Sequence, residues 1–514
     1  MRAVAAVVTP PPPLSALQGA SAGVVAWNLA RARRACKALE EWWLSEESCQ
    51  LPWQEVARAQ KRRARAIQRR RLEAHVAQRG TGDVGPAVAV NSPAAPDQPA
   101  LHPHRRLDPR HPQTRFGAST IQRTGSRRPG GPAVPPLDNQ LPVPARSFSD
   151  ALHRRLVQAA VQGPFEEAPA RVADATGVTG PKRRAEQVVR DAARDFEAFY
   201  QARIPPPAVA TGPILVAALA GTGVPMVKAA PARRVARRGQ GEKAPPKKMA
   251  VGATVYTQQP RVRSPEEGVA RLVARGPRPA DDPIPGWPRP EYKRVWASLT
   301  TGRGDVLCEV RQALLRRDPA HTKHWVVRTD GARALQQNVK RRLRGLPLGL
   351  DFQHGLEKLW QAADACHGEG HPQAIAWVQE RAWRLLHGEV SQVVQGMRPS
   401  ATKRGLQGHR RKAVDAAAGY CYRNRRHRPS PADLRQGWPS ATGVVEGACK
   451  NLIKDRMERS GMRWTGQMAE AMLKLRATYL SGDFEAYGAF QIHQDQQRVH
   501  PPKTWQPGKI VDEK

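Results

Sequence analysis

The spacing of apolar positions changes along the chain and predicts elements of different kinds. Between residues 147 and 205 apolar side chains recur at helical spacing, on two short helices that Gly177 separates. On the second helix, polar side chains occupy another face: Arg183, Arg184, Gln187, Arg190 and Arg194. A helix-turn-helix presents such cations and an amide to a DNA groove. A generic amphipathic hairpin would give the same pattern, so both interpretations stay open.

Two apolar runs further along predict buried strands. Residues 214–227 (ILVAALAGTGVPMV) are apolar and lead into a Gly-rich turn, and residues 325–329 (WVVRT) end in Asp330-Gly331. From 355 to 422 the helical spacing returns and predicts a mostly helical insertion. The expected fold class is therefore α/β.

The N-terminal part is less regular. Residues 1–71 predict a basic segment that is disordered in part, and its run at 61–71 (KRRARAIQRRR) holds seven cations in eleven residues. Such a run suits an arm that follows phosphates, a solvated helix face or a disordered tail. Residues 72–146 are rich in Pro, Gly and Arg, with a few short strand-like segments, and predict a small β module.

Composition points to a polyanionic partner. The formal charge is +38, and cations that neutralise phosphates release counterions, so nucleic acid is the expected partner. A GC-rich genome would favour the same composition, because 64 of the 83 cations are Arg and the chain has 47 Pro and 42 Gly. The six cysteines form no C-x-x-C pair and suit a reducing compartment. Without an apolar run of membrane length, a cytoplasmic location is expected.

The stretch most specific for function is residues 444–464, VVEGACKNLIKDRMERSGMRW. Glu446 opens a helix rich in cations, and Lys450 and Lys454 follow at i+4 and i+8, near one helical face. This arrangement suits a carboxylate on a metal ion with two cations on DNA phosphate. Ordinary i,i+4 ion pairing, worth about 0.2–0.5 kcal/mol, is the alternative.

The sequence VVEGACKNLIKDRMERSG closely resembles the C-terminal motif of the ISKra family of bacterial insertion-sequence transposases. Weaker matches extend from about Leu72 to residue 497. The resemblance implies a ribonuclease H-like core that carries a DDE triad and uses Mg²⁺ or Mn²⁺. It also implies double-stranded DNA as partner, at terminal inverted repeats and at the target, a homo-oligomer in the transpososome and a nucleoid-associated location.

The resemblance assigns the triad residue by residue. Glu446 matches the last triad position and Asp330 the second, so these two residues are the expected metal ligands. At the first position, directly before Gly221, the family has Asp and this chain has Ala220. The sequence Asp351-x-x-His354 resembles a signature that supports the active site in related transposases. Asp351 could equally cap the helix that follows, and the two roles are compatible.

The same resemblance orders the domains. The FG at 116–117 and PLD at 136–138 resemble remnants of a family β module, although Gly125-Ser126 replaces an aromatic-basic pair, so this module is expected to be degraded. The predicted segments are the basic segment (1–71), the β module (72–146), the helix-turn-helix-like region (147–205), the catalytic core (206–355), its helical insertion (356–436), the core's last helices (437–497) and a tail (498–514).

These observations predict a transposase, and the loss of the first triad Asp is expected to impair its activity. Two other classes remain open. A catalytically dead, repressor-like relic would bind terminal repeats without cutting them. A general nucleic-acid-coating protein would explain the charge, but not the acidic positions.

Overall fold

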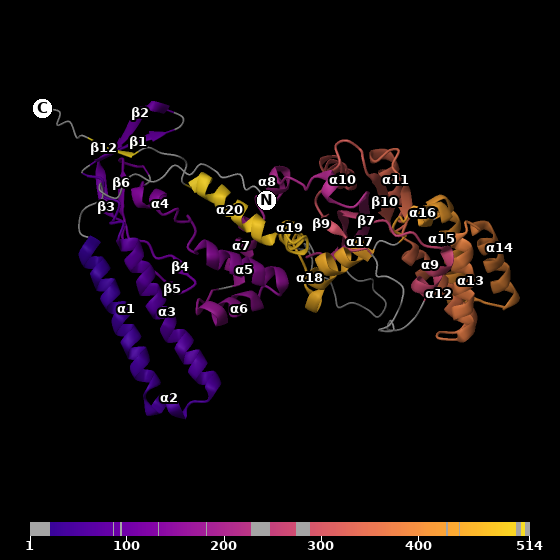
Figure 1. Cartoon of the computed structure of the whole chain (residues 1–514), viewed down its shortest axis with the longest axis horizontal. Coiled ribbons are helices and arrows are strands. Elements are labelled where there is room, and N and C mark those ends of the chain that lie inside the picture. The colour runs from indigo at the N-terminus through magenta and orange to yellow at the C-terminus, as the bar shows by residue number, and fades with distance from the viewer. Residues whose placement is uncertain are drawn as a thin grey trace, which may run out of the picture. The chain divides into compact units, whose positions relative to one another are not determined.

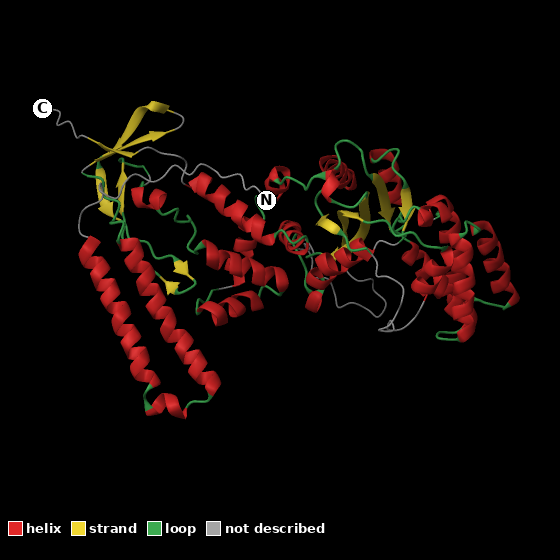
Figure 2. Cartoon of the chain, in the orientation of Figure 1, coloured by secondary structure: helices red, strands yellow, loops and turns green. Residues whose placement is uncertain are grey.

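The structure of the chain is a computed structural model (Figures 1 and 2). It describes residues 21–85, 87–92, 95–131, 133–180, 182–227, 247–273, 288–427, 430–440, 443–499 and 505–508. The chain divides into two compact units, residues 1–195 with 486–514, and residues 196–485. Both helices and a mixed sheet are present, so the α/β class is confirmed. Within the described part of the chain, no helix combines the length and the apolar character needed to cross a membrane.

The unit formed by residues 196–485 is built on a five-stranded mixed sheet with the strand order β11-β10-β7-β8-β9. β7, β8 and β9 are antiparallel neighbours, whereas β10 and β11 run parallel to β7. The strands span Ile214–Pro225 (β7), Lys247–Gln258 (β8), Glu291–Ser298 (β9), His324–Thr329 (β10) and Leu348–Leu350 (β11). The apolar runs predicted as buried strands are β7 and β10, whose residues are almost all buried.

The predicted Gly-rich turn after residue 220 is wrong, because β7 continues as a strand to Pro225, paired with Lys247 of β8. The glycines serve close packing instead. A Cβ on Gly223 would lie 2.9 Å from Cβ of Lys247, and one on Gly221 would lie 3.3 Å from Cε of Met249. Gly therefore lets the side chains of β8 cross over this end of β7.

Helices cover both faces of the sheet. On one face of the sheet, Gly252 lies next to Cys449 of η4. Val255 of β8 and its partner Arg294 of β9 point to the other face, where Glu309 of α10 is close enough to Arg294 to affect its pKa. α10 and η4 therefore lie on opposite faces. The helices around the sheet are α8 (Phe196–Ala202), η2 (Ala208–Ala210), α10 (Arg303–Arg317), α11 (Arg333–Arg342), α17 (Gly443–Ala448), η4 (Cys449–Lys454), α18 (Asp455–Met457), η5 (Arg459–Gly461) and α19 (Gly466–Leu480).

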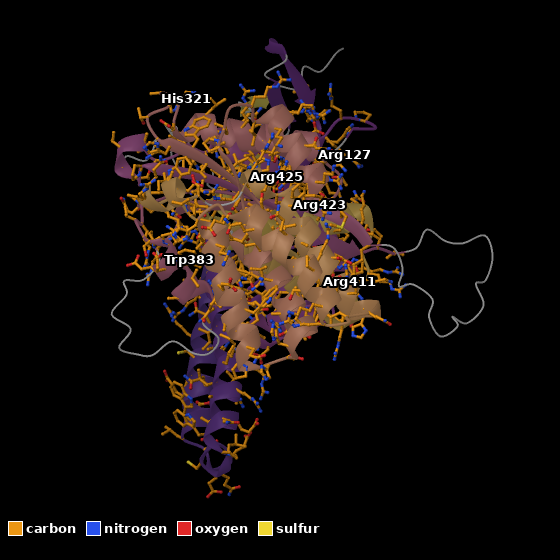
Figure 3. The ribbon with its side chains drawn as sticks, turned by 90° about the vertical axis from the view of Figure 1, so that its right-hand side faces the viewer. Arg127, His321, Trp383, Arg411, Arg423 and Arg425 are labelled. Carbon is orange, nitrogen blue, oxygen red and sulfur yellow. The ribbon has the colours of Figure 1, made fainter. Side chains whose placement is uncertain are left out.

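The predicted helical insertion forms a separate apolar core. Leu356, Leu359, Val378 and Leu385, all predicted from helical spacing, are fully buried in it. Its helices are α9 (Pro265–Val273), α12 (Phe352–His367), α13 (Pro372–Leu386), α14 (Val390–Lys403), α15 (Gly408–Arg423), η3 (Arg425–His427) and α16 (Pro431–Arg435). Figure 3 shows the side chains of this part, with Arg411, Arg423 and Arg425 labelled.

The other unit begins with a helical hairpin, α1 (Ser21–Trp43), α2 (Glu46–Gln50) and α3 (Trp53–Ala77). Of the segment 1–71, which is expected to be disordered in part, the structure describes residues 21–71, and residues 1–20 lie outside the described residues. The cation run at 61–71 lies on α3, where several of its members have partners inside the unit. Lys61 donates to the Asp174 carbonyl at 2.8 Å, and the Arg63 guanidinium lies 4.1 Å from the Trp42 ring centroid.

Short strands follow α3 within residues 72–146, the segment for which a degraded β module is expected. β1 and β2 form a sheet with β12, and β3 pairs with β6 and β4 with β5. Their bounds are Ala87–Ser92 (β1), Ala95–His102 (β2), His104–Leu107 (β3), Gln113–Thr114 (β4), Gly117–Ala118 (β5), Thr124–Arg127 (β6) and Trp505–Gly508 (β12), with the short helix α4 at Pro136–Gln140. β12 belongs to the predicted tail, of which residues 500–504 and 509–514 lie outside the described residues.

The helical region of this unit consists of α5 (Asp150–Gln162), α6 (Glu167–Thr176) and α7 (Lys182–Ala192). Gly177 ends α6 in the left-handed conformation, with φ 72°, as a glycine can without strain. The predicted division of α7 into two faces is confirmed. Its apolar side chains are buried, and the five polar side chains named above as DNA-binding candidates are exposed, including Arg194 just beyond the helix.

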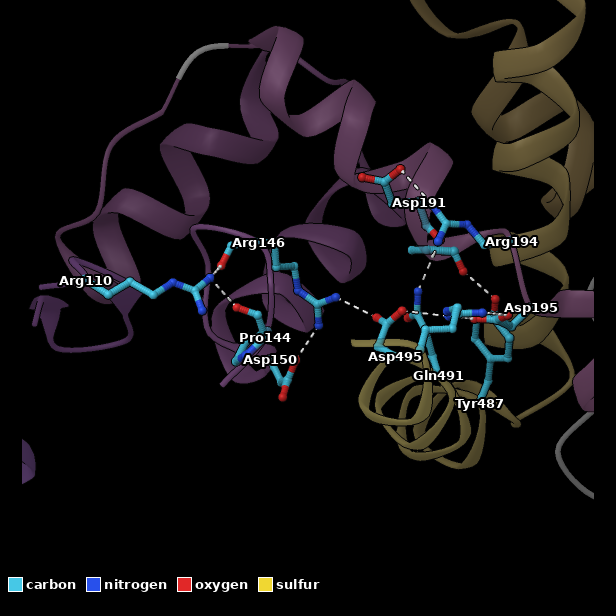
Figure 4. A network of polar contacts seen from close by, with 12 residues as sticks. Arg110, Pro144, Arg146, Asp150, Asp191, Arg194, Asp195, Tyr487, Gln491 and Asp495 are labelled. Atoms are coloured by element: carbon cyan, nitrogen blue, oxygen red, sulfur yellow. Dashed lines mark hydrogen bonds and ion pairs between the residues drawn. The ribbon is translucent and has the colours of Figure 1, made fainter. Parts of the chain in front are cut away.

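The C-terminal helix α20 (Phe484–Val499) completes this unit (Figure 4). The Tyr487 hydroxyl donates to the Ala192 carbonyl, and Arg498 holds both carboxylate oxygens of Asp195 at 2.7 Å. Arg146 bridges Asp150 and Asp495. The predicted core boundary at residue 497 therefore differs from the observed division, in which residues from 486 onward join the N-terminal unit.

Replacing Arg498 by Met is expected to loosen α20, since Asp195 is buried and would keep an unpaired charge. The loss should be about 2 kcal/mol, which corresponds to about thirtyfold faster amide exchange in α20, measured by hydrogen–deuterium exchange. Arg194→Met is the matched control, because Arg194 is exposed and its partner Asp191 lies 3.7 Å away. Equal exchange in the two variants would show that the Arg498 pair contributes nothing.

Candidate active site at the carboxyl edge of the sheet

Two of the residues matched to the triad, Asp330 and Ala220, lie near Asp351 at the end of the parallel strands. Asp330 follows β10, Asp351 follows β11, and Ala220 lies on β7 one step beyond the Leu219–Thr329 pair. The N–H of Gly221 donates to Oδ2 of Asp330 at 3.2 Å, and the N–H of Asp351 donates to the Thr329 carbonyl at 2.9 Å. In open α/β sheets this edge is where ligands bind.

Asp330 is held by backbone on both sides. Its Oδ1 accepts the N–H of Ala332 at 2.9 Å, in addition to the Gly221 bond to Oδ2. Gly331 has φ 86°, and a Cβ there would lie 2.7 Å from the Tyr420 hydroxyl. The Asp-Gly pair after the strand is therefore required by local packing, and it fixes the Asp330 carboxylate beside the backbone that follows Ala220.

Glu446 meets a different pair of residues. One ligand atom each from Asp351, His354 and Glu446 lies within 4.8 Å of the others. Oε1 of Glu446 is buried and has no hydrogen-bond partner in the described part of the chain, and Nε2 of His354 is 3.5 Å from it. A buried carboxylate oxygen without a donor is costly unless a cation satisfies it, so the residues present fit a divalent metal ion.

The His354 ring is oriented by a second carboxylate. Its Nδ1 lies 3.1 Å from Oε2 of Glu357, which leaves Nε2 directed at Glu446. Burial opposes protonation, but the Glu357 hydrogen bond and the charges of Asp351 and Glu446 outweigh it and raise the pKa of His354. An imidazole whose far nitrogen is held by a carboxylate is the usual arrangement of a metal-binding histidine.

Asp351 has both of the roles that the sequence left open. Its Oδ1 accepts the N–H of Gln353 at 2.8 Å and caps α12, and its carboxyl group also belongs to the cluster with Glu446. Burial raises the pKa of Asp351 to about 8, and a hydrogen bond to the Glu446 carboxyl group and the charge of Glu446 add to the effect. Two carboxylates this close favour a shared proton or a cation between them.

A cysteine lies near Ala220, the residue at the position matched to the first triad Asp. Ala220 is 6% exposed and pairs with Gly252, and a Cβ on Gly252 would lie 3.2 Å from Sγ of Cys449. Burial raises the pKa of the Cys449 thiol, and the charges of Asp330 and Glu446 add to the effect. Ala220 thus lies between the Cys449 thiol, which packs against Gly252, and the Asp330 carboxylate, which accepts the N–H of Gly221.

The helix that carries Glu446 is not a regular α-helix. Glu446 lies on α17, and the segment Cys449–Lys454 that follows it, with Lys450 and Lys454, is π-helical. π-helical turns concentrate at functional sites, where they shift side chains relative to the preceding turn. Lys450 and Lys454 are exposed, whereas Glu446 is half-buried, so the two cations remain accessible to an external anion.

The metal ligands expected from the sequence are Asp330 and Glu446, and the structure brings only one of them into the cluster described above. The structure groups Glu446 with Asp351 and His354, and Asp330 is outside that group. Glu357 was missed, although the spacing Asp351-x-x-His354-x-x-Glu357 puts all three residues on one helical face. Cys449 was missed as well, three residues after Glu446. The candidate DNA-binding residues of α7 belong to the other unit.

Comparisons with known proteins assign no family. No protein-family model matches the chain, and no curated protein matches it significantly.

The raised pKa of Asp351 has a consequence for stability without metal. Because it exceeds the usual value of 3.8, the folded state binds protons more tightly, and stability should fall as pH rises from about 4 towards 8. Asp351→Asn should flatten this dependence, measured as denaturation midpoints between pH 5 and pH 8 with a chelator present. A variant that retains the full slope would show that another group, such as His354, causes it.

Proposed function

We propose that the protein is a DDE-type DNA transposase, related to the ISKra family, whose strand-cleavage activity is impaired by Ala220. The observation that carries the proposal lies at the carboxyl edge of the mixed sheet, where Asp351 and Glu446 meet with His354 and where Asp330 follows the neighbouring strand β10. The motif around Glu446 resembles the catalytic motif of that family. Its substrate would be double-stranded DNA at terminal inverted repeats and at a target.

The strand order supports a ribonuclease H-like core. Such a core has three antiparallel strands and two further strands that run parallel to the first, on its other side. β7, β8 and β9 correspond to the antiparallel strands, and β10 and β11 correspond to the parallel pair. Asp330 then follows the first parallel strand, and the late helix α17 brings Glu446 to the same edge.

Asp351, His354 and Glu446 would hold a divalent cation, Mn²⁺ or Mg²⁺. The imidazole favours Mn²⁺, since Mg²⁺ prefers oxygen ligands. Bound metal ions supply charge stabilisation to the attacking and leaving oxygens of a phosphodiester. Among the chain's own residues, Glu357 would orient His354, and the backbone N–H groups of Gly221 and Ala332 would keep Asp330 in place.

Exposed cations would hold the DNA. On α7, Arg183, Arg190 and Gln187 are solvent-exposed, and they can turn from their surface partners to DNA. In the helical insertion, Arg423 and Arg425 are exposed, and Arg425 lies over the Tyr422 ring at 4.3 Å (Figure 3). A transposase of this kind would act on nucleoid DNA in the cytoplasm as a homo-oligomer.

The second candidate function is a catalytically dead DNA-binding protein, favoured by one observation. Ala220 cannot ligate a metal ion, and its buried surroundings hold a thiol in place of a carboxylate. Such a relic would bind terminal repeats and compete with active transposase.

Binding of terminal-repeat DNA, measured by fluorescence anisotropy, tests what the two candidates share. We expect the double variant Arg183→Gln/Arg190→Gln to reduce the slope of log affinity against log salt by about 2. Arg31→Gln, on α1, is the control. Equal affinity for all DNA sequences would favour a general coating protein. Mn²⁺-dependent nicking then separates a transposase from a relic.

A further inference from the structure

A cationic cavity lies at the end of the sheet opposite to the carboxylates. It has a volume of about 220 Å³ and is lined by residues near Tyr200, the start of β9, the end of α10 and the turn at Ser481–Asp483. Glu291 at the start of β9 pairs with Thr257, next to the Gln258–Ile214 pair, whereas Ala220 lies at the other end of β7. This cavity is therefore separate from the site at Glu446.

Positive charge predominates on the cavity wall. Five cations line it, namely Arg203, Lys293, Arg294, Arg316 and Arg317, together with a single carboxylate, Asp483. Asp483 is already engaged, because it pairs with Arg203 and accepts the Tyr200 hydroxyl at 3.0 Å. Glu309 interacts electrostatically with Arg294 but does not line the cavity. Burial raises the pKa of Glu309. The lining thus carries an excess of cations.

Arg317 and Arg294 are the cations left unsatisfied. Nη1 of Arg317 and Nε of Arg294 are buried and have no hydrogen-bond partner within the described residues. Burial, followed by repulsion from Arg294 and Arg203, lowers the pKa of Arg317 to about 10. Leaving a buried cation without a partner costs stability, so an anion in the cavity would offset a penalty that the free protein carries.

The backbone of β9 brings further groups to the cavity. Val255 pairs with Arg294 and Thr257 pairs with Glu291, so β9 has one extra residue between these pairs, a β-bulge. Tyr292, in this bulge, has φ 47°, which is strained for a residue with a side chain. The bulge places Lys293 on the cavity lining and leaves Tyr292 54% exposed at its rim.

Structural roles account for only part of this cluster. Arg316 donates to the carbonyls of Tyr200 and Arg203, both at 2.6 Å, and thereby caps α8. The Arg294 guanidinium lies 4.0 Å from the Tyr200 ring centroid and 4.5 Å from that of Trp296, which fixes its orientation. Arg317 lies in the last turn of α10, but its interaction with the helix dipole does not require burial, because an exposed cation at this position would interact with the dipole equally well. No such role explains the unsatisfied Nη1 of Arg317 or the position of Lys293.

We propose that this cavity is a phosphate-binding site, in which Arg317, Lys293 and the stacked Arg294 receive one phosphate group. The cavity is smaller than the 300–1,000 Å³ typical of sites for drug-sized ligands, which suits a phosphate and the atoms next to it. The phosphate would belong either to a nucleic-acid strand or to a free phosphorylated molecule. The site does not depend on the transposase assignment, since none of its residues touches the carboxylate cluster.

Binding of inorganic phosphate to the full chain, measured by titration calorimetry in chloride buffer of constant ionic strength, tests the site. Arg317→Met and Lys293→Gln should each weaken phosphate binding at least tenfold. Arg311→Met is the matched control, since Arg311 is exposed on the same helix and does not line the cavity. Without phosphate, Arg317→Met should be at least as stable as the natural protein, because it removes an unsatisfied buried cation.

Two results would overturn the proposal: phosphate binding that Arg317→Met and Lys293→Gln leave unchanged, or an Arg317→Met variant that loses stability and keeps its phosphate affinity. A DNA arm identifies the source of the phosphate. If the nucleic-acid backbone supplies it, Arg317→Met should lower the salt slope of DNA binding by about 1 relative to Arg311→Met. An unchanged slope with lost phosphate binding would assign the site to a free phosphorylated molecule.

Discussion

Replacing Ala220 by Asp is expected to raise the rate of Mn²⁺-dependent cleavage of terminal-repeat DNA by about three powers of ten. One restored metal site should supply on the order of 4 kcal/mol of transition-state stabilisation. The new carboxylate would lie on β7 beside Asp330, whose Oδ2 already accepts the N–H of Gly221. The measurement is the single-turnover cleavage rate of the natural protein and of the variant at equal Mn²⁺ concentration.

A second property of the same variant separates metal binding from a general effect on folding. Ala220 is buried next to the Cys449 thiol, so an Asp there should destabilise the metal-free protein, and Mn²⁺ should restore the loss. Ala220→Asn, which has the same shape without the charge, should gain neither cleavage nor Mn²⁺ stabilisation. If the natural protein cleaves as fast as Ala220→Asp, Asp351 replaces the missing carboxylate and the proposed impairment is wrong.

Replacing Glu446 by Gln is expected to weaken Mn²⁺ binding more than about 100-fold, since even outer partners of metal ligands contribute 10- to 100-fold. Oε1 of Glu446 is buried and finds no donor among the described residues, and Nε2 of His354 lies 3.5 Å from it. At the same time, the metal-free variant should be more stable at neutral pH. Burial, together with the hydrogen bond and the charge of Glu446, raises the pKa of Asp351, and the variant removes this charge from beside the buried carboxyl group. Calorimetric titration with Mn²⁺ and a thermal melt measure the two effects.

Glu369→Gln is the control for this experiment, since Glu369 is exposed and lies outside the cluster. Glu357→Gln should show an intermediate loss of about 10- to 100-fold, because Glu357 acts on the metal only through the orientation of His354. Mn²⁺ affinity that is equal in Glu446→Gln and in the natural protein would exclude the cluster as a metal site. Any remaining cleavage would then have to depend on Asp330.

Much of the fold could be predicted because local patterns decide it. The apolar run of β7 and the strand that ends at Asp330-Gly331 are buried as expected, and α7 has the predicted apolar and polar faces. These features follow from side-chain periodicity, which requires no knowledge of distant residues. The turn expected after Ala220 failed because strand pairing with Lys247 and Met249 of β8, far along the chain, extends β7 through its glycines.

The ligand set of the site was less predictable. Asp351 was predicted as a helix cap from its neighbours in the sequence, and it does cap α12. Its carboxyl group also lies close to Glu446, which is 95 residues away in the sequence. The π-helical segment Cys449–Lys454 likewise has no period that the sequence reveals. Such proximities arise from long-range packing.

The sequence by itself determined the basic character of the chain, the α/β class, the strand before Asp330 and the exposed cations of α7. Charge and periodicity are sums over neighbouring residues, so they can be obtained without coordinates. Only the tertiary structure decided that Glu446 joins Asp351 and His354, that α20 completes the N-terminal unit, and that five cations share one cavity. Each of these depends on which distant strands and helices pack together, because a side chain's electrostatic surroundings are set by its neighbours in space.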